Sequence, residues 1–259
     1  MSVQTNRPTL LLIHGAWQGA WVWDAFQQEM QQKGWPTHAV DLPGNGHDDT
    51  PADQVNLDSY VRCLTDWIDA QDGPVVLVGH SGGGVVASQT AEARPERVQA
   101  VVYLAGMMLP SGVGFGEVVQ AVLPLHPAAA GIGPYLQWSP ARDLSWVPPE
   151  AAQDIFLHDC PPEVAEPASH RLVPQPEAGR ALVATLTPER FGRIPRIYVE
   201  ALYDRSVILP VQRHMQTLCP GAHRLSIATG HAPHVAAPHL LAELLDDALS
   251  TIVKSGQPD

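Results

Sequence analysis

The sequence predicts an α/β fold in which a mostly parallel, doubly wound sheet carries helices on both faces. Short apolar runs alternate along the chain with segments whose apolar residues recur at helical spacing. The runs are continuous, which is typical of parallel strands buried on both faces. The chain has 259 residues, 45% of them hydrophobic, so it is long and apolar enough for one large domain of this class.

The first four elements follow in strand–helix order. Residues 9–13 form a continuous apolar run and predict a strand. A helix is expected over 21–33, with Gly34 as its stop signal. A second strand is expected over 37–40 and a second helix over 57–70, because apolar residues recur there at helical spacing.

The same order continues on both sides of one long interruption. Before it, a strand begins at Val75, small residues lead at once into a helix over 85–91, and another strand covers 98–105. After it, the expected elements are a strand over 196–201, a helix over 210–218 opened by proline, a strand over 223–227 and a closing helix over 240–253.

The interruption is rich in prolines, glycines and short helical pieces. We interpret it as an insertion that covers the site and not as an independent domain. The predicted organisation is therefore a core of residues 1–106 and 191–259 with a cap insertion of 107–190.

Composition excludes several classes of partner. The formal net charge is -12, so phosphate groups of nucleic acid or of an anionic membrane would be repelled. The three cysteines are far apart and lack C-x-x-C spacing, which predicts neither a disulfide framework nor a metal site. The polar N-terminus lacks the apolar core of a signal peptide, and no run is long enough for a membrane span. A cytoplasmic location is the expectation.

Gly79-His80-Ser81-Gly82-Gly83 fits the pattern G-x-S-x-G, known as the nucleophile elbow. The strand must turn into the helix within a residue or two, which places Ser81 in strained backbone geometry and requires small neighbours. The serine hydroxyl is then held clear of the sheet, ready to act as a nucleophile. The alternative is a glycine-rich turn that carries an idle serine.

A serine nucleophile needs a base, and the base needs an orienting acid. His231 follows the last predicted strand, at the sheet edge where ligands bind, and is preferred to His234 three residues later. Asp204 is the carboxylate in the turn after the preceding strand, whereas Glu200 lies within that strand. The loop after strand 98–105, another place for the acid, offers no carboxylate.

The oxyanion of an acyl-transfer reaction needs hydrogen-bond donors. We expect one from the N–H of Gly82, directly after the nucleophile, and one from Ala16 in the loop after the first strand. His14 is expected to end that strand and to bond loop backbone. His80 is expected either to line the pocket or to pack. Three nearby tryptophans are expected to pack in the core, at positions 17, 21 and 23.

Several segments together resemble the α/β-hydrolase superfamily, namely 11–17, 21–23, 41–44 and 78–83. The match is best to the branch that contains plant hydroxynitrile lyases, salicylate-ester and methyl-ester esterases and related bacterial esterases. Asp204 and His231 fall where that branch keeps its acid and base. The resemblance covers nearly the whole chain and implies an α/β-hydrolase fold with an inserted cap.

The branch contains two chemistries. Its lyases use a threonine after the strand-ending histidine and a lysine after the catalytic histidine, but this chain has Gly15 and Ala232 there. Neither side chain can hold a cyanohydrin hydroxyl or cyanide. We therefore expect ester hydrolysis by Ser81, His231 and Asp204 through an acyl-enzyme, without metal or cofactor.

Three alternatives remain at this point: cyanohydrin cleavage, a cofactor-free haloperoxidase or C–C hydrolase on the same triad, and a non-catalytic small-molecule receptor. The expected partner is a small-molecule ester that fits an apolar acyl or aryl pocket, and a homodimer is left open. The expected pocket residues are His80, Met107 and Trp138, although cap residues such as Trp138 also suit a packing role.

Overall fold

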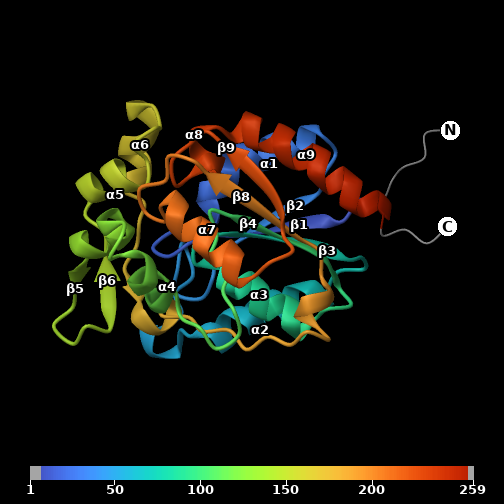
Figure 1. Ribbon diagram of the computed structural model, residues 1–259, viewed down its shortest axis with the longest axis horizontal. Coiled ribbons are helices and arrows are strands. Elements are labelled where there is room, and N and C mark those ends of the chain that lie inside the picture. The colour runs from blue at the N-terminus through green and yellow to red at the C-terminus, as the bar shows by residue number, and fades with distance from the viewer. Residues whose placement is uncertain (1–6, 256–259) are drawn as a thin grey trace.

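The computed structural model describes residues 7–255, so the ends of the chain at 1–6 and 256–259 lie outside the described residues. Most of the polar N-terminal stretch that argues against a signal peptide is thus not covered. A six-stranded parallel sheet, in the order β2-β1-β3-β4-β8-β9, crosses the molecule (Figure 1). Its strands are β1 (Thr9–Ile13), β2 (Thr37–Val40), β3 (Val75–His80), β4 (Val98–Leu104), β8 (Arg196–Ala201) and β9 (His223–Ile227).

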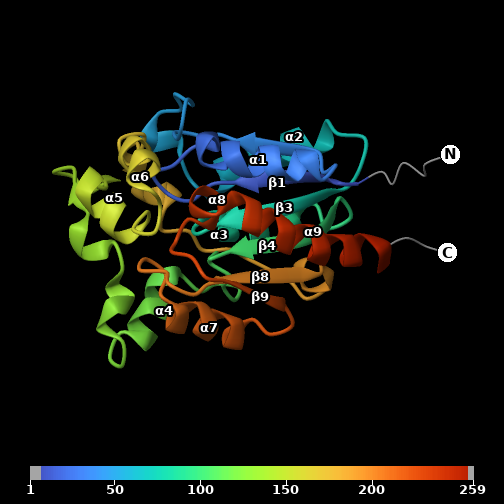
Figure 2. The same cartoon turned by 90° about the horizontal axis from the view of Figure 1, so that it is seen from above.

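Helices cover both faces of this sheet because its central strands are apolar on both sides (Figures 1 and 2). Leu10 and Leu12 of β1 pack in one core cluster, whereas Leu11 and Ile13 pack in another. The first cluster includes α1 (Asp24–Gln32) and α9 (Pro238–Ser255), and the second includes α2 (Leu57–Asp69), α3 (Gly83–Ala93) and α7 (Leu209–Leu218). The predicted doubly wound parallel sheet is therefore confirmed.

Some predicted boundaries are wrong, and the backbone gives the reason. The helix expected over 21–33 is divided into a 3-10 turn, Ala20–Trp23, followed by α1. The strand expected over 98–105 ends at Leu104, because Ala105 has a positive φ of 42°. The closing helix is longer than expected and is preceded by a one-turn helix, α8 (Pro233–Ala236), before α9.

The short elements between residues 115 and 179 gather at one end of the molecule, beyond the carboxyl ends of the strands, whereas residues 185–190 bond Gln89 and Glu92 near the carboxyl end of α3 (Figures 1 and 2). Three very short strands pair as an antiparallel sheet in the order β5-β6-β7. An apolar cluster that includes Phe156 and Ala152 of this segment also contains Trp17 and Ala232 of the loops that follow β1 and β9. The segment comprises α4 (Phe115–Val122), β5 (Gln137–Trp138), β6 (Leu144–Trp146), α5 (Pro149–Ile155), α6 (Pro162–Ser169), β7 (Gln175–Pro176) and several 3-10 turns.

No helix among residues 7–255 combines the length and the apolar character that crossing a bilayer requires.

The sharp connection from β3 to α3 depends on glycine. A Cβ at Gly79 would lie 2.6 Å from the carbonyl oxygen of Gly83 and 2.8 Å from Gly84 Cα. A Cβ at Gly83 would lie 2.6 Å from the carbonyl oxygens of Ile13 and His14 in the neighbouring strand. Because these obstacles are backbone atoms, the helix can start against the sheet only with glycine at both positions.

We expect Gly79→Ala to lower the free energy of unfolding by about 2 kcal/mol or more, because the added methyl group collides with backbone that cannot rotate away. Urea titration followed by circular dichroism measures the change. Gly73→Ala is the matched control, since a Cβ at Gly73 meets nothing within 4 Å; it should stay within about 0.5 kcal/mol of wild type. Equal stability of the two variants would contradict the argument.

Candidate active site

Ser81 occupies the single residue between β3 and the cap of α3, and its backbone has a positive φ of 51°. Its carbonyl oxygen accepts hydrogen bonds from Gly84 N–H at 3.0 Å and Met107 N–H at 2.8 Å, and its own N–H donates to Leu104 at 3.3 Å. These bonds hold a backbone conformation that a non-glycine residue rarely adopts. The sequence prediction of a strained, presented serine is thus matched by the observed geometry.

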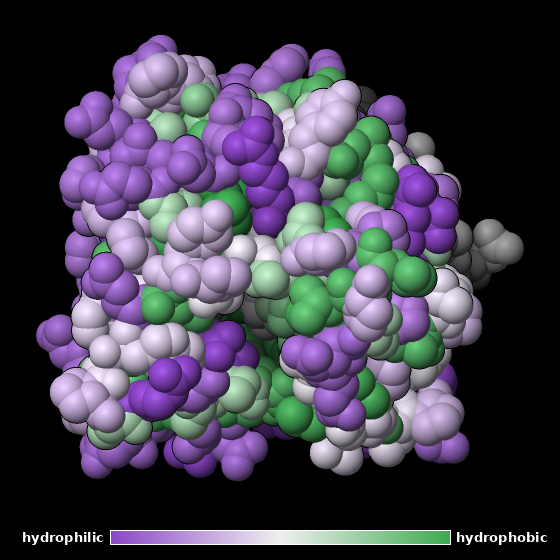
Figure 3. Space-filling model, turned by 60° about the vertical axis from the view of Figure 1, so that its left-hand side comes forward, coloured by the Kyte–Doolittle hydropathy of each residue, from purple (hydrophilic) through white to green (hydrophobic). Residues whose placement is uncertain are grey.

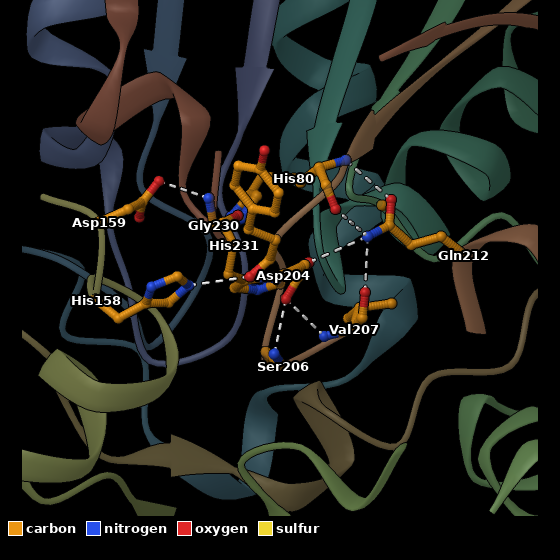
Figure 4. A network of polar contacts seen from close by, with 12 residues as sticks. His80, His158, Asp159, Asp204, Ser206, Val207, Gln212, Gly230 and His231 are labelled. Atoms are coloured by element: carbon orange, nitrogen blue, oxygen red, sulfur yellow. Dashed lines mark hydrogen bonds and ion pairs between the residues drawn. The ribbon is translucent and has the colours of Figure 1, made fainter. Parts of the chain in front are cut away.

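Asp204 and His231 form a buried pair. The loops after β8 and β9, two adjacent strands, bring them together, and His231 Nδ1–H donates to Asp204 Oδ2 at 2.8 Å (Figure 4). The other carboxylate oxygen accepts from Ser206 N–H at 2.7 Å and Val207 N–H at 2.9 Å, while Gln212 Nε2 approaches Oδ2 at 3.5 Å. The carboxylate is therefore fixed in position, and its hydrogen bond from Nδ1–H fixes the tautomer of the His231 imidazole.

Residues from the 107–190 segment also touch these two loops. Asp159 Oδ2 accepts a hydrogen bond from Gly230 N–H at 2.5 Å, directly before His231 (Figure 4). His158 Nε2–H donates to the carbonyl oxygen of Tyr203 at 3.0 Å, directly before Asp204. A Cβ at Gly230 would lie 2.5 Å from Asp159 Oδ1, so the close contact requires glycine there.

Ser81 and His231 line the same cavity, which has a volume of about 420 Å³. Among the described residues Ser81 Oγ has no hydrogen bond to His231, so the structure brings the two to one cavity without joining them. Figure 3 shows the corresponding face, where a hollow is bordered by apolar residues. The apolar lining of the cavity includes Leu42, Val86, Met107, Phe115, Val119, Phe156, Leu182 and Val207.

The two expected oxyanion donors, Ala16 and Gly82, also line this cavity. Within residues 7–255 neither backbone N–H donates to a protein acceptor. Gly82 stands at the amino end of α3, where the helix dipole favours negative charge. Both groups are therefore available to an oxygen in the cavity.

The expectations for pocket residues are met in part. His80 and Met107 line the cavity, as expected. Trp138 does not line the cavity: it lies in β5, and its ring centre is 4.6 Å from the Arg142 guanidinium and 5.4 Å from that of Arg180. Trp17 is buried and packs on Phe156, as expected of a core residue, but it also lines the cavity.

A polar wall of the cavity was missed from the sequence. It consists of Asn45, Tyr60 and Gln175, all about 1% exposed and hydrogen-bonded to one another. These residues come from three distant segments and belong to no motif, so no local pattern could have identified them.

The family model described as the alpha/beta hydrolase family matches residues 10–244. The chain belongs to this family.

Relatives within the family include a pyrethroid hydrolase from Sphingobium wenxiniae, which is 29% identical over 92% of this chain and 86% of that protein. Methylesterase 17 of Arabidopsis thaliana is 24% identical over 95% of this chain and 92% of its own length. The crystal structure of a pyrethroid hydrolase from Sphingobium faniae superposes with a TM-score of 0.82 at 29% identity, covering 95% of this chain and 98% of the other. The predicted α/β-hydrolase fold and family are therefore confirmed.

Two histidines beside the site have structural roles in this alpha/beta hydrolase. Leu42 N–H donates to His14 Nε2 at 3.1 Å, so His14 Nδ1 carries the proton and donates to the Gly15 carbonyl at 2.7 Å, as expected for a strand-ending residue. Burial lowers the pKa of His14 to about 4. His80 Nε2 lies 2.8 Å from the carbonyl oxygen of His231 and its Nδ1 lies 3.1 Å from Gln18 Oε1, so the ring links the elbow to the loops after β9 and β1.

His234, the second choice for the base, is fully buried and does not line the cavity. Its ring lies 4.3 Å from Trp23 and 4.4 Å from His80, and neither ring nitrogen has a hydrogen-bond partner among the described residues. It lies in the one-turn helix α8, which precedes the closing helix α9. Burial lowers its pKa to about 3. A ring that cannot take up a proton near neutral pH and lies outside the cavity is unsuited to act as the base.

We expect His234→Phe to flatten the dependence of stability on pH. Burial lowers the pKa of His234 in the native state to about 3, from an ordinary histidine value of 6.5. The unfolded chain therefore takes up a proton below pH 6.5 that the native state refuses, and stability falls as the pH falls. Between pH 7.5 and 5.5 wild type should lose about 1.4 kcal/mol more than the variant, as measured by urea unfolding at each pH. Parallel losses would show that His234 does not resist protonation.

Proposed function

We propose that the chain is a serine hydrolase that cleaves carboxylic esters. The observation that carries the proposal is the buried hydrogen bond between Asp204 and His231, beside a cavity that Ser81 also lines. Relatives named as a pyrethroid hydrolase and as methylesterases support hydrolysis of esters. The backbone N–H groups of Ala16 and Gly82, as oxyanion donors, complete the set of groups that acyl transfer requires.

In the proposed reaction Ser81 Oγ attacks the acyl carbon while its proton passes to His231 Nε2. The Ala16 and Gly82 N–H groups stabilise the negative oxygen of the tetrahedral intermediate. His231 then protonates the leaving alkoxide, and an acyl-enzyme remains on Ser81. Water attacks this ester as His231 takes its proton, and the acid leaves as Ser81 recovers its hydrogen. Asp204 holds the imidazole and stabilises its charged form.

The cavity limits the substrate class. Its volume of about 420 Å³ and its mostly apolar walls suit small esters with an apolar acyl or aryl group. We assign the walls that close it from above to a cap of residues 107–190, which supplies Phe115, Phe156 and Leu182. A cytoplasmic location, expected from the sequence, belongs to the same proposal.

Cyanohydrin cleavage fits the site less well. A Cβ at Gly15 would lie 3.0 Å from Ser81 Cβ and 3.2 Å from His80 Nδ1, so the threonine of the lyases has little room there. Ala232, where those lyases carry lysine, is fully buried in an apolar cluster. Neither position supplies a hydroxyl or an ammonium group for the lyase reaction.

Ser81→Ala should abolish hydrolysis of short- and medium-chain p-nitrophenyl esters, because the nucleophile is removed. Asp204→Asn should lower kcat about 10⁴-fold, because the amide favours the wrong tautomer of His231. Release of p-nitrophenol measures both.

Glu243→Gln, far from the cavity on α9, is the control and should retain wild-type turnover. Ester hydrolysis that survives in Ser81→Ala, or a folded wild type that hydrolyses no ester, would refute the proposal.

Mandelonitrile should release no cyanide above the buffer background with the wild-type protein. The physical reason is that Gly15 and Ala232 supply neither the hydroxyl nor the ammonium group of the lyases, so no cation stabilises the cyanide as it departs. A colorimetric cyanide assay run beside the ester series distinguishes the two chemistries. Cyanide release that depends on Ser81 would identify the protein as a lyase.

A further inference from the structure

Three consecutive backbone N–H groups follow β1, and they differ in whether a protein acceptor binds them. Gly15 N–H donates to Gln18 Oε1 at 3.0 Å, and Trp17 N–H donates to Gln175 Oε1 at 3.0 Å. Within residues 7–255 the middle group, Ala16 N–H, has no protein acceptor, although Ala16 lines the cavity. The two outer peptides are thus fixed by buried glutamine side chains, and the middle N–H is left for a ligand.

Residues of the 107–190 segment hold Trp17 at three separate points. Besides the bond from its N–H to Gln175, its carbonyl oxygen accepts from Val173 N–H at 2.9 Å, and its indole N–H points to the Ser145 carbonyl at 3.2 Å. Trp17 has a φ of 63°, which a residue with a side chain rarely adopts without external support. The loop therefore owes its conformation to contacts that are distant in sequence.

The donor and acceptor ends of the Gln175 amide are fixed by a closed ring of hydrogen bonds. Its Nε2 donates to the Tyr60 hydroxyl at 3.0 Å, Tyr60 donates to Asn45 Oδ1 at 3.1 Å, and Asn45 Nδ2 donates back to Gln175 Oε1 at 2.9 Å. Because Trp17 N–H can only donate, Oε1 must be the atom that faces it. All side chains of the ring are buried and satisfied, so the amide has no alternative orientation of equal energy.

We propose that Gln175 is a positioning residue for catalysis, which holds the Ala16–Trp17 peptide so that Ala16 N–H meets the oxyanion. The inference rests on the proposed ester hydrolysis and assigns a part in it to a residue of the cavity wall, which acts through the Trp17 N–H. The Ala16 N–H stabilises the oxyanion, and this negative charge is present in the tetrahedral intermediate and not in the bound ester. Loss of Gln175 should therefore lower kcat and leave KM nearly unchanged.

The test compares three variants on one p-nitrophenyl ester. Gln175→Met keeps the length of the side chain but removes the acceptor, and kcat should fall about 10–100-fold with KM within about twofold of wild type. Gln175→Glu keeps an oxygen that can accept from Trp17 N–H and should recover most of the lost kcat. Tyr60→Phe removes a member of the ring but keeps the bond to Trp17, so its loss of kcat should be several-fold smaller than that of Gln175→Met.

Melting temperatures separate positioning from a general loss of structure. Gln175→Met and Tyr60→Phe each leave buried polar groups unpaired, so both should melt lower than wild type. A loss of kcat that follows the loss in melting temperature across the variants, or no loss of kcat in Gln175→Met, would overturn the inference while wild-type hydrolysis upholds the proposed function. A folded wild type without Ser81-dependent hydrolysis would overturn both.

Discussion

The buried hydrogen bond between His231 and Asp204 is the interaction on which the rest of the site depends. It joins residues that are 27 positions apart, and it exists because β8 and β9 are adjacent and parallel, so their following loops meet at one edge of the sheet. Two backbone N–H groups fix the carboxylate, and the carboxylate fixes the imidazole. A one-residue shift of register between the strands would separate the pair, so the apolar pattern that sets the register also sets the chemistry.

Ser81, the proposed nucleophile, comes to the same edge by a second constraint, the close approach of α3 to the sheet. Glycines at 79 and 83 permit this approach, and the turn between them leaves Ser81 with a positive φ. His80 connects the turn that carries Ser81 with the loop that carries His231, because its Nε2 lies 2.8 Å from the His231 carbonyl oxygen. Burial keeps the pKa of His80 well below its usual value.

The sequence predicts most of the sheet because its central strands β1, β3 and β4 are largely apolar runs that can be recognised without knowledge of their neighbours. Strands 9–13, 37–40, 196–201 and 223–227 have the bounds expected of them. The candidate site residues could also be chosen from the sequence, since Ser81, Asp204 and His231 each follow a strand that could be identified. Most of the cavity wall could not be predicted. Trp17 and Gln175 meet through contacts 158 residues apart in sequence, and a local pattern carries no information on such a pairing.

The 107–190 segment does more than enclose the cavity. It bonds Gly230 before His231, Tyr203 before Asp204 and Trp17 after the first strand, so it supports all three loops. Polar contacts of this kind are directional and buried, and a shift of the segment changes the loops with it. Under the proposed ester hydrolysis, substitutions in this segment therefore reach the loops that carry Asp204, His231 and Trp17 as well as the cavity wall.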